Sequence, residues 1–272
     1  MTLGEILQFD FIQRSIIVGV LIGAVLALFS PLVILRRMAF FGGGLAHASL
    51  AGIAIGLAVG WQPLMIAIVF GMLLALFMEW LERRTKLASD TIIGIFFAAS
   101  MSLGVVIISL SRGFQPDLVS FLFGNILSIQ SVELIITAVL SFILIVFFVY
   151  YRQQLFLLAF DADTARLTGV KVAVLEIAFR MLLAVAVIIG VKVIGIVLVS
   201  ALLVLPAATA KLLTGSLKAL TTWTFVISEA TIVIGLLVSF VLDWPSGATI
   251  ILVGTVIFLI TALVMRPLFK KS

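Results

Sequence analysis

The sequence predicts an all-α protein, a membrane-embedded bundle of about eight to nine transmembrane helices that forms a single domain over residues 1–272. Hydrophobic residues make up 64% of the chain and charged residues only 11%. Soluble domains are close to half apolar and a quarter charged. The apolar residues also gather in runs of about 20, which is the length that crosses a bilayer. No long polar linker separates these runs, so we expect one domain.

Nine apolar segments follow one another along the chain. They span approximately 15–35, 43–60, 64–81, 91–110, 134–151, 172–190, 193–213, 220–242 and 248–265. Residues 1–14 form an amphipathic lead-in that is suited to the membrane interface. Only a tight link near Lys192 separates the sixth segment from the seventh. The half-apolar stretch 114–131 fits either a surface helix or a re-entrant segment.

The 17 lysines and arginines predict the orientation of these segments, because positive residues concentrate in cytoplasmic loops. With the N-terminus outside, 13 of them fall in cytoplasmic connections. Only Arg14, Arg112 and Lys192 fall on the outer side, and Arg180 lies within a segment. We therefore expect a multi-pass protein of the cell membrane with a cytoplasmic C-terminus. The positive net charge of +5 is a topology signal, so we expect no nucleic-acid partner.

The longest predicted cytoplasmic connection covers residues 152–171. It mixes apolar residues with Asp161, Asp163 and Arg166, and Gly169 lies near its end. This pattern fits a short amphipathic helix at the inner face that packs on another protein. It fits a solvated loop equally well, and the pattern alone does not separate the two.

Ionisable residues inside membrane segments are costly and therefore mark candidate functional sites. They are His47, Glu176, Arg180 and Glu229, with Glu79 at the end of a segment. Glu176 and Arg180 are four residues apart, so we expect them to form an ion pair on one helix face. Glu229 has no evident partner and serves either a transport path or a buried hydrogen bond to a neighbouring serine or threonine.

His47 is the only histidine in the chain, and it follows three consecutive glycines, Gly42–Gly44. Imidazole is a common ligand of zinc, copper and iron and also serves manganese. Three glycines weaken a helix by about 1 kcal/mol each relative to alanine. They indicate either close backbone approach or local unwinding, and an unwound segment frees carbonyl groups that bind cations. Ordinary packing of small residues between helices is the alternative.

Catalytic signatures are missing from the sequence, so we expect that the chain is not an enzyme. It contains no cysteine, which excludes disulfides, iron–sulfur clusters and thiolate metal sites. It has neither HExxH nor GxSxG, and it lacks the GxxxxGK[ST] loop that binds ATP phosphates. Any energy from ATP must come from a partner.

Six strings in order resemble the metal-permease family of bacterial ATP-binding-cassette importers, which take up zinc, manganese or iron. They are LRRMAFFGGGLAHASLAGIAIG (35–56), SDTIIGIFFAASMSLGVVIISL (89–110), PDLVSFLFGNILSI (116–129), FDADTARLTGV (160–170), VIGIVLVSALLVLPAATAKLL (193–213) and DWPSGATIIL (243–252). They are spread along the chain from residue 35 to residue 252.

The resemblance implies a set of partners. It implies a homodimer of permease subunits in membrane lipid, with the metal path at its centre. A dimer of cytoplasmic ATPase subunits docks below, and an extracytoplasmic metal-binding protein delivers the ion from above. The family's cytoplasmic coupling loop falls on Asp161, Arg166 and Gly169.

The chain departs from the family pattern at two positions. Many members have an aspartate four residues before the histidine, where this chain has Gly43. A second family aspartate is replaced by Asn125. His47 is therefore the main expected metal ligand, and the Gly43 backbone, Asp117, Asn125 and Glu229 are lesser candidates. The chain binds no permanent cofactor in this view.

The sequence thus predicts the permease subunit of an ATP-driven importer of divalent transition metal ions, zinc or manganese, that works by alternating access. Two alternatives remain. One is an ion-coupled secondary transporter that uses Glu229, and the other is a permease of the same family with a different ligand.

Overall fold

The computed structural model describes residues 10–85, 87–110 and 131–269. This part of the chain contains nine helices that are long and apolar enough to cross a membrane, as predicted. The helices are α2 (Asp10–Leu35), α3 (Ala39–Val59), α4 (Pro63–Thr85), α5 (Ser89–Leu110), α7 (Ser131–Phe160), α8 (Ala162–Leu167), α9 (Val172–Ile194), α10 (Ile196–Leu213), α11 (Leu217–Leu242) and α12 (Ser246–Phe269). All of them except the short helix α8 are candidate spans.

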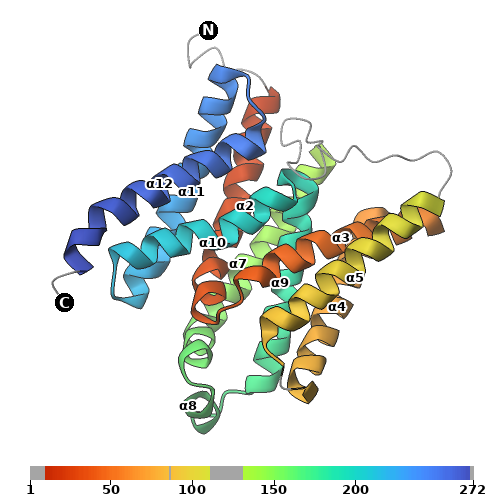
Figure 1. Ribbon diagram of the computed structural model, residues 1–272, viewed down its shortest axis with the longest axis horizontal. Coiled ribbons are helices and arrows are strands. Elements are labelled where there is room, and N and C mark those ends of the chain that lie inside the picture. The colour runs from red at the N-terminus through yellow and green to blue at the C-terminus, as the bar shows by residue number, and fades with distance from the viewer. Residues whose placement is uncertain (1–9, 86, 111–130, 270–272) are drawn as a thin grey trace.

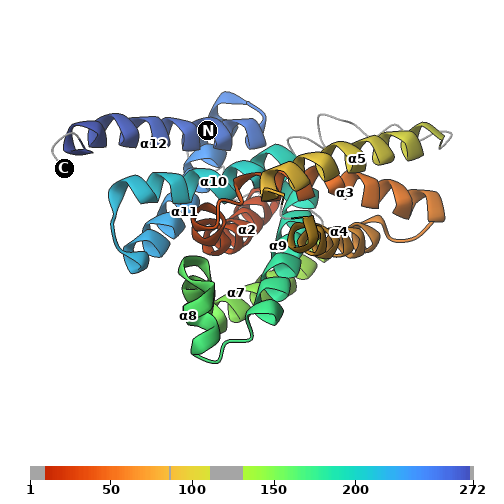
Figure 2. The same ribbon diagram turned by 60° about the horizontal axis from the view of Figure 1, so that its bottom comes forward.

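The helices form two groups joined by a central set (Figure 1, Figure 2). Helix α3 packs against α4 and α5 on one side of the molecule. Helices α10, α11 and α12 pack against one another on the other side. Helix α2 contacts α7, α9, α10 and α11 and so lies at the centre. Helix α3 also contacts α10, which places the two groups side by side at this junction.

Aromatic packing marks the centre of the core. The ring of Phe29 on α2 lies 5.8 Å from that of Phe148 on α7 and 5.7 Å from that of Phe179 on α9. All three side chains are fully buried. Aromatic pairs at such distances add to the stabilisation from burial, so these rings help to hold the three helices together.

Glycines end two of the helices. Gly60 adopts a left-handed conformation (φ 76°) and caps the end of α3 through hydrogen bonds from its N–H to the Gly56 and Leu57 carbonyls. Gly195 (φ 86°) forms the one-residue break between α9 and α10, and this is the tight link predicted near Lys192. Residues other than glycine rarely adopt such positive φ angles.

The boundaries of two predicted segments differ in the structure. Helix α7 continues to Phe160, so the first half of the predicted connection 152–171 extends the membrane helix. The run 152–160 is mostly apolar and α7 packs against α9, which explains the extension. Of the predicted lead-in 1–14, residues 10–14 belong to α2. The remainder of the lead-in lies outside the described residues, as does nearly all of the stretch 114–131.

Candidate functional site

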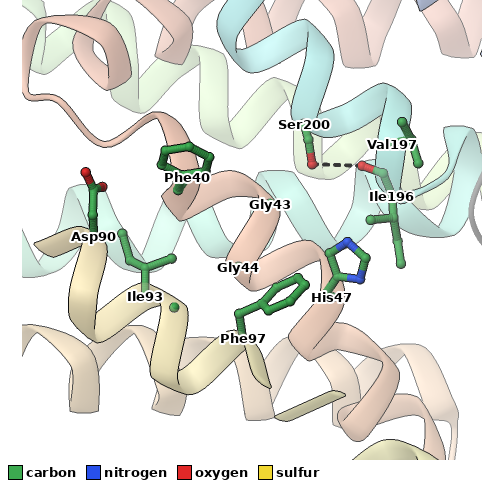
Figure 3. A pocket seen from close by; sticks show the side chains of 11 residues that line it. Phe40, Gly43, Gly44, His47, Asp90, Ile93, Phe97, Ile196, Val197 and Ser200 are labelled. Atoms are coloured by element: carbon green, nitrogen blue, oxygen red, sulfur yellow. Dashed lines mark hydrogen bonds between the residues drawn. The ribbon is translucent and has the colours of Figure 1, made fainter. Parts of the chain in front are cut away.

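A cavity of about 520 Å³ lies between α3, α5 and α10 (Figure 3). The residues that α3 contributes recur every three or four positions and are Phe40, Gly43, Gly44 and His47. The residues from α5 follow the same spacing and are Asp90, Ile93, Gly94 and Phe97. Helix α10 contributes Ile196, Val197 and Ser200. Residues at this spacing share one helix face, so one face of α3 and one face of α5 border the cavity.

Glycines account for the free volume. A Cβ atom at Gly43 would meet only the Ser200 Oγ within 4 Å, at 3.6 Å, and a Cβ at Gly94 would meet nothing within 4 Å. Gly44, in contrast, permits close helix packing, because a Cβ there would lie 2.7 Å from Ile93 Cγ2. The glycines before His47 therefore allow a close backbone approach and leave a hollow beside it.

Local unwinding at the glycines, one of the sequence-based alternatives, is wrong. Helix α3 is continuous from Ala39 to Val59. In an α-helix the carbonyl of residue i accepts a hydrogen bond from the N–H of residue i+4, so the Gly43 carbonyl is engaged by the His47 N–H. Packing of α3 against α4 and α5 stabilises the helix despite the glycines.

His47 lies more than two turns into α3 because the helix begins at Ala39. Its ring packs edge-on against Phe97, with 4.6 Å between the ring centroids. The side chain is partly exposed, and neither imidazole nitrogen has a hydrogen-bond partner among the described residues. Figure 3 shows the ring at the cavity wall. An imidazole held in this way can offer a nitrogen lone pair to a cation.

The predicted ion pair between Glu176 and Arg180 is wrong. The Glu176 carboxylate instead accepts hydrogen bonds from Arg36, at 2.7 Å, and from Arg83, also at 2.7 Å. Arg36 follows α2 and Arg83 lies on α4, so Glu176 joins three helices. Spacing along one helix predicts a local pair, but the packing of α2 and α4 against α9 offers Glu176 two guanidinium groups.

Arg180 pairs with two carboxylates of α4. It contacts Glu79, whose side chain is buried, and it donates a hydrogen bond to Glu82 at 2.8 Å. Glu82 in turn accepts a hydrogen bond from the Ser89 hydroxyl, at 2.6 Å, at the start of α5. This ion network therefore places the end of α2, the end of α4, the start of α5 and the first half of α9 at one end of the molecule. The predicted alternation of the spans requires this arrangement.

Glu229 lies outside the cavity. It faces α2 from α11, and its Oε1 is 3.3 Å from the point that a Cβ of Gly23 would occupy. Neighbouring Ser228 donates a hydrogen bond to the Gly23 carbonyl at 3.3 Å. Both carboxylate oxygens of Glu229 are buried, and neither has a hydrogen-bond partner among the described residues. The structure does not bring Glu229 and His47 together.

The predicted coupling residues lie on and beside α8, which projects from one end of the molecule (Figure 1). The Asp161 carboxylate caps this helix by accepting hydrogen bonds from the N–H groups of Asp163 and Thr164. Arg166 pairs with Asp163 at 2.8 Å. Gly169 (φ 85°) turns the chain after the helix. Hydrogen bonds from Thr164 lower the pKa of Asp161 below its ordinary value of 3.8, so the cap is ionised at neutral pH.

Two of the lesser candidate ligands, Asp117 and Asn125, lie outside the described residues. Sequence reasoning did not identify Asp90 and Ser200, two polar residues that line the cavity. Asp90 lies in the first turn of α5, one residue before the predicted segment 91–110, and so is not among the ionisable residues inside the predicted segments. Ser200 is a common residue in an apolar helix. Only the packing of α5 and α10 against α3 shows that both residues line the cavity.

Among the described residues, no group of three histidine, cysteine, aspartate or glutamate side chains is arranged to hold a metal ion. The cavity instead offers one imidazole and one carboxylate among mostly apolar walls, while the Ser200 hydroxyl donates to the Ile196 carbonyl of its own helix. A few donors in such a cavity can hold a small cation transiently and let it leave. The candidate spans among the described residues define the class of the molecule, an integral membrane protein.

The comparisons identify the family. The profile of the ABC 3 transport family matches residues 8–265. A manganese transport system membrane protein of Listeria monocytogenes is 32% identical over 258 residues, which cover 95% of this chain and 92% of that protein. A high-affinity zinc uptake system membrane protein of Haemophilus influenzae is 28% identical over 97% of this chain and 99% of its own length. The chain therefore belongs to the ABC 3 transport family of membrane permeases.

A solved structure agrees with this assignment. The structure of PsaBC from Streptococcus pneumoniae in complex with Fab contains a chain with a TM-score of 0.86 and 29% sequence identity. The match covers 99% of this chain and 98% of that one. The similarity extends over nearly the whole bundle, so the fold described above is that of the family.

Proposed function

We propose that this protein is the permease subunit of an ATP-driven importer of divalent transition metal ions, with manganese or zinc as the substrate. The observation that carries the proposal is the His47 imidazole at the wall of a cavity inside the membrane-spanning part. Neutral imidazole binds manganese and zinc. Relatives of nearly equal length are named for manganese transport and for zinc uptake.

The orientation we propose places the N-terminus outside and the C-terminus in the cytoplasm of a bacterial cell. The positive residues favour it, and the ion network agrees because it contains Arg36, Arg83 and Arg180 at one end of the bundle. Helix α3 then starts at the cytoplasmic side, and His47 lies about 12 Å along it.

The partners we propose follow from the family. Two copies of the chain form a homodimer in the membrane around a central metal path. A dimer of ATPase subunits docks on α8, where Asp161, Arg166 and Gly169 shape the contact. An extracytoplasmic metal-binding protein delivers the ion. The permease itself catalyses no reaction, because the ATPase partner hydrolyses ATP.

In the proposed mechanism His47 is the main ligand, and Gly43 leaves space where many members of the family have an aspartate. Loss of that carboxylate makes the site weaker, which suits an ion that must leave again. The Gly43 carbonyl is engaged in a helix hydrogen bond, and Glu229 does not line the cavity. Neither group is therefore favoured as a replacement for the missing aspartate. Asp117 and Asn125 stay candidates. Closure of the ATPase dimer moves α8 and opens the His47 cavity to one side at a time.

The test is uptake by the complete complex in proteoliposomes. Manganese and zinc uptake should require ATP and survive an uncoupler that dissipates the proton gradient. Uptake without ATP that collapses with the uncoupler would instead support an ion-coupled secondary transporter. ATP-driven transport of another compound, with neither metal stimulating ATP hydrolysis, would support a permease with a different ligand.

A further inference from the structure

The cavity beside His47 has a second ionisable group at its far end. In Figure 3, Asp90 lies to the left and His47 to the right, with Gly43 and Gly44 between them. Both side chains line the same cavity, but they come from different helices, α5 and α3. The cavity therefore extends from the imidazole to a carboxylate.

Helix contacts give the direction of this path. Gly44 of α3 packs on Ile93 of α5, and Ala51 of α3 packs against Gly104. Residue numbers rise together in these contacts, so the two helices run parallel. Phe97 lies at the level of His47, and Asp90 precedes Phe97 by two turns of helix, which is about 10 Å. Asp90 is thus nearer to the ends where both helices begin.

Hydrogen bonds fix the start of α5, where Asp90 lies. The preceding residue, Ser89, donates a hydrogen bond to Glu82 at 2.6 Å, and Glu82 also accepts from Arg180 at 2.8 Å. The start of α5 is thereby tied to α4 and α9. Asp90 itself is exposed and forms no ion pair with a described residue. Its carboxylate is therefore available to a mobile cation.

We propose that Asp90 is a second cation-binding residue on the transport path, which receives the divalent metal ion after it leaves His47. The inference rests on the proposed function and orientation, which make the Asp90 end of the cavity the cytoplasmic end. A carboxylate is a good ligand for manganese and also binds zinc. Two weak sites in series favour conduction, because each step of release is small.

The simpler role for Asp90 is purely structural, since an acidic residue in the first turn of a helix interacts favourably with the helix dipole. One pair of variants separates the two roles. Asp90→Asn removes the carboxylate. The double variant Asp90→Asn/Thr91→Asp keeps an acid in the first turn of α5 but moves it to an exposed position that does not line the cavity.

The experiment measures radioactive manganese and zinc uptake by the complete complex in proteoliposomes, at saturating ATP. We expect Asp90→Asn to lower the maximal uptake rate about tenfold, equivalent to about 1.4 kcal/mol in the barrier. The half-saturating metal concentration should stay within about twofold, because His47 is unchanged. The double variant should be equally slow, and Asp90→Glu should regain most of the rate.

Wild-type uptake by Asp90→Asn, or full recovery in the double variant, would overturn the inference and leave the proposed function intact. Absence of metal uptake by the wild-type complex would instead reject the proposed function. If Asp90→Asn does not assemble, the comparison between the double variant and Asp90→Glu decides the matter. Equal rates for these two would then assign Asp90 a structural role.

Discussion

The guanidinium of Arg36 lies 2.7 Å from the carboxylate of Glu176 and joins the end of α2 to α9. The two side chains are only 13% and 20% exposed. Glu176 also holds Arg83 of α4, at 2.7 Å. Three helices therefore meet at one carboxylate. It lies at the end of the bundle where α9 begins, shortly after α8 in the chain. Under the proposed function, movement of α8 passes into the membrane helices at this end.

Glu176→Gln should destabilise the protein by about 1–3 kcal/mol, because it leaves Arg36 largely buried without an ionised partner. The midpoint of thermal unfolding in detergent measures this effect. Asp163→Asn is the matched control, since it removes an ion pair with Arg166 in which both side chains are mostly exposed. Exposed pairs contribute little, so the control should unfold close to the wild type. Equal midpoints for both variants would contradict a structural role of the network.

Two glycine variants on α3 test the packing of the cavity. Gly43→Ala should be neutral or stabilise the protein by about 0.5–1 kcal/mol, because the space is free and alanine favours a helix. Gly52→Ala should destabilise it by about 1–3 kcal/mol, because the new Cβ would lie 2.5 Å from the backbone Cα of Ala67. Chemical or thermal unfolding compares the two. The reverse order of stability would show that the cavity is closed at Gly43.

Gly43→Asp should tighten metal binding, since it adds a carboxylate one turn before His47. Its Cβ would meet only the Ser200 Oγ within 4 Å, at 3.6 Å, and Gly43 lines the cavity. We expect the half-saturating metal concentration for uptake to fall about tenfold, which corresponds to about 1.4 kcal/mol. Gly94→Asp adds a carboxylate to the same cavity from α5 and serves as the control for charge alone. An unchanged concentration dependence in Gly43→Asp would argue against metal binding beside His47.

Asp161→Ala should uncouple ATP hydrolysis from uptake, because it removes the carboxylate that caps α8. ATP consumed per metal ion taken up measures the coupling, and we expect this ratio to rise several-fold. Asp161→Ser retains a capping oxygen and should couple almost normally. Because the pKa of Asp161 is lowered, its carboxylate stays ionised at any pH above its ordinary pKa of 3.8. Only stronger acid protonates the carboxylate and so removes the cap. A fall in uptake between pH 7.5 and 5.5 therefore cannot come from this cap.

Glu229→Gln should leave metal uptake unchanged within about twofold and should not lower stability. Both oxygens of Glu229 are buried without a hydrogen-bond partner among the described residues, and a buried carboxylate without partners is costly. The neutral amide has a similar shape. Metal uptake and thermal unfolding check the two expectations. Loss of uptake in this variant, with normal assembly, would indicate that Glu229 lies on the transport path.

The spans could be predicted from the sequence because the length and hydrophobicity of each segment are local properties. Local composition offered a close approach at the glycines as one of several alternatives, and the structure shows it at Gly44. The partners of Glu176 and Arg180 could not be predicted, because they depend on how α2, α4 and α9 pack. Asp90 was missed for the same reason. Its place in the cavity follows from the parallel packing of α3 and α5, which no spacing within either segment shows.

The most direct test of the account is the effect of His47→Ala on the metal dependence of uptake by the complete complex. Ser200→Ala is the matched control, because Ser200 lines the same cavity but donates its hydrogen bond to the Ile196 carbonyl of its own helix. We predict that His47→Ala raises the half-saturating manganese or zinc concentration at least about tenfold, while Ser200→Ala stays near the wild type. A His47→Ala complex with the wild-type concentration dependence would contradict the assignment of His47 as the metal ligand.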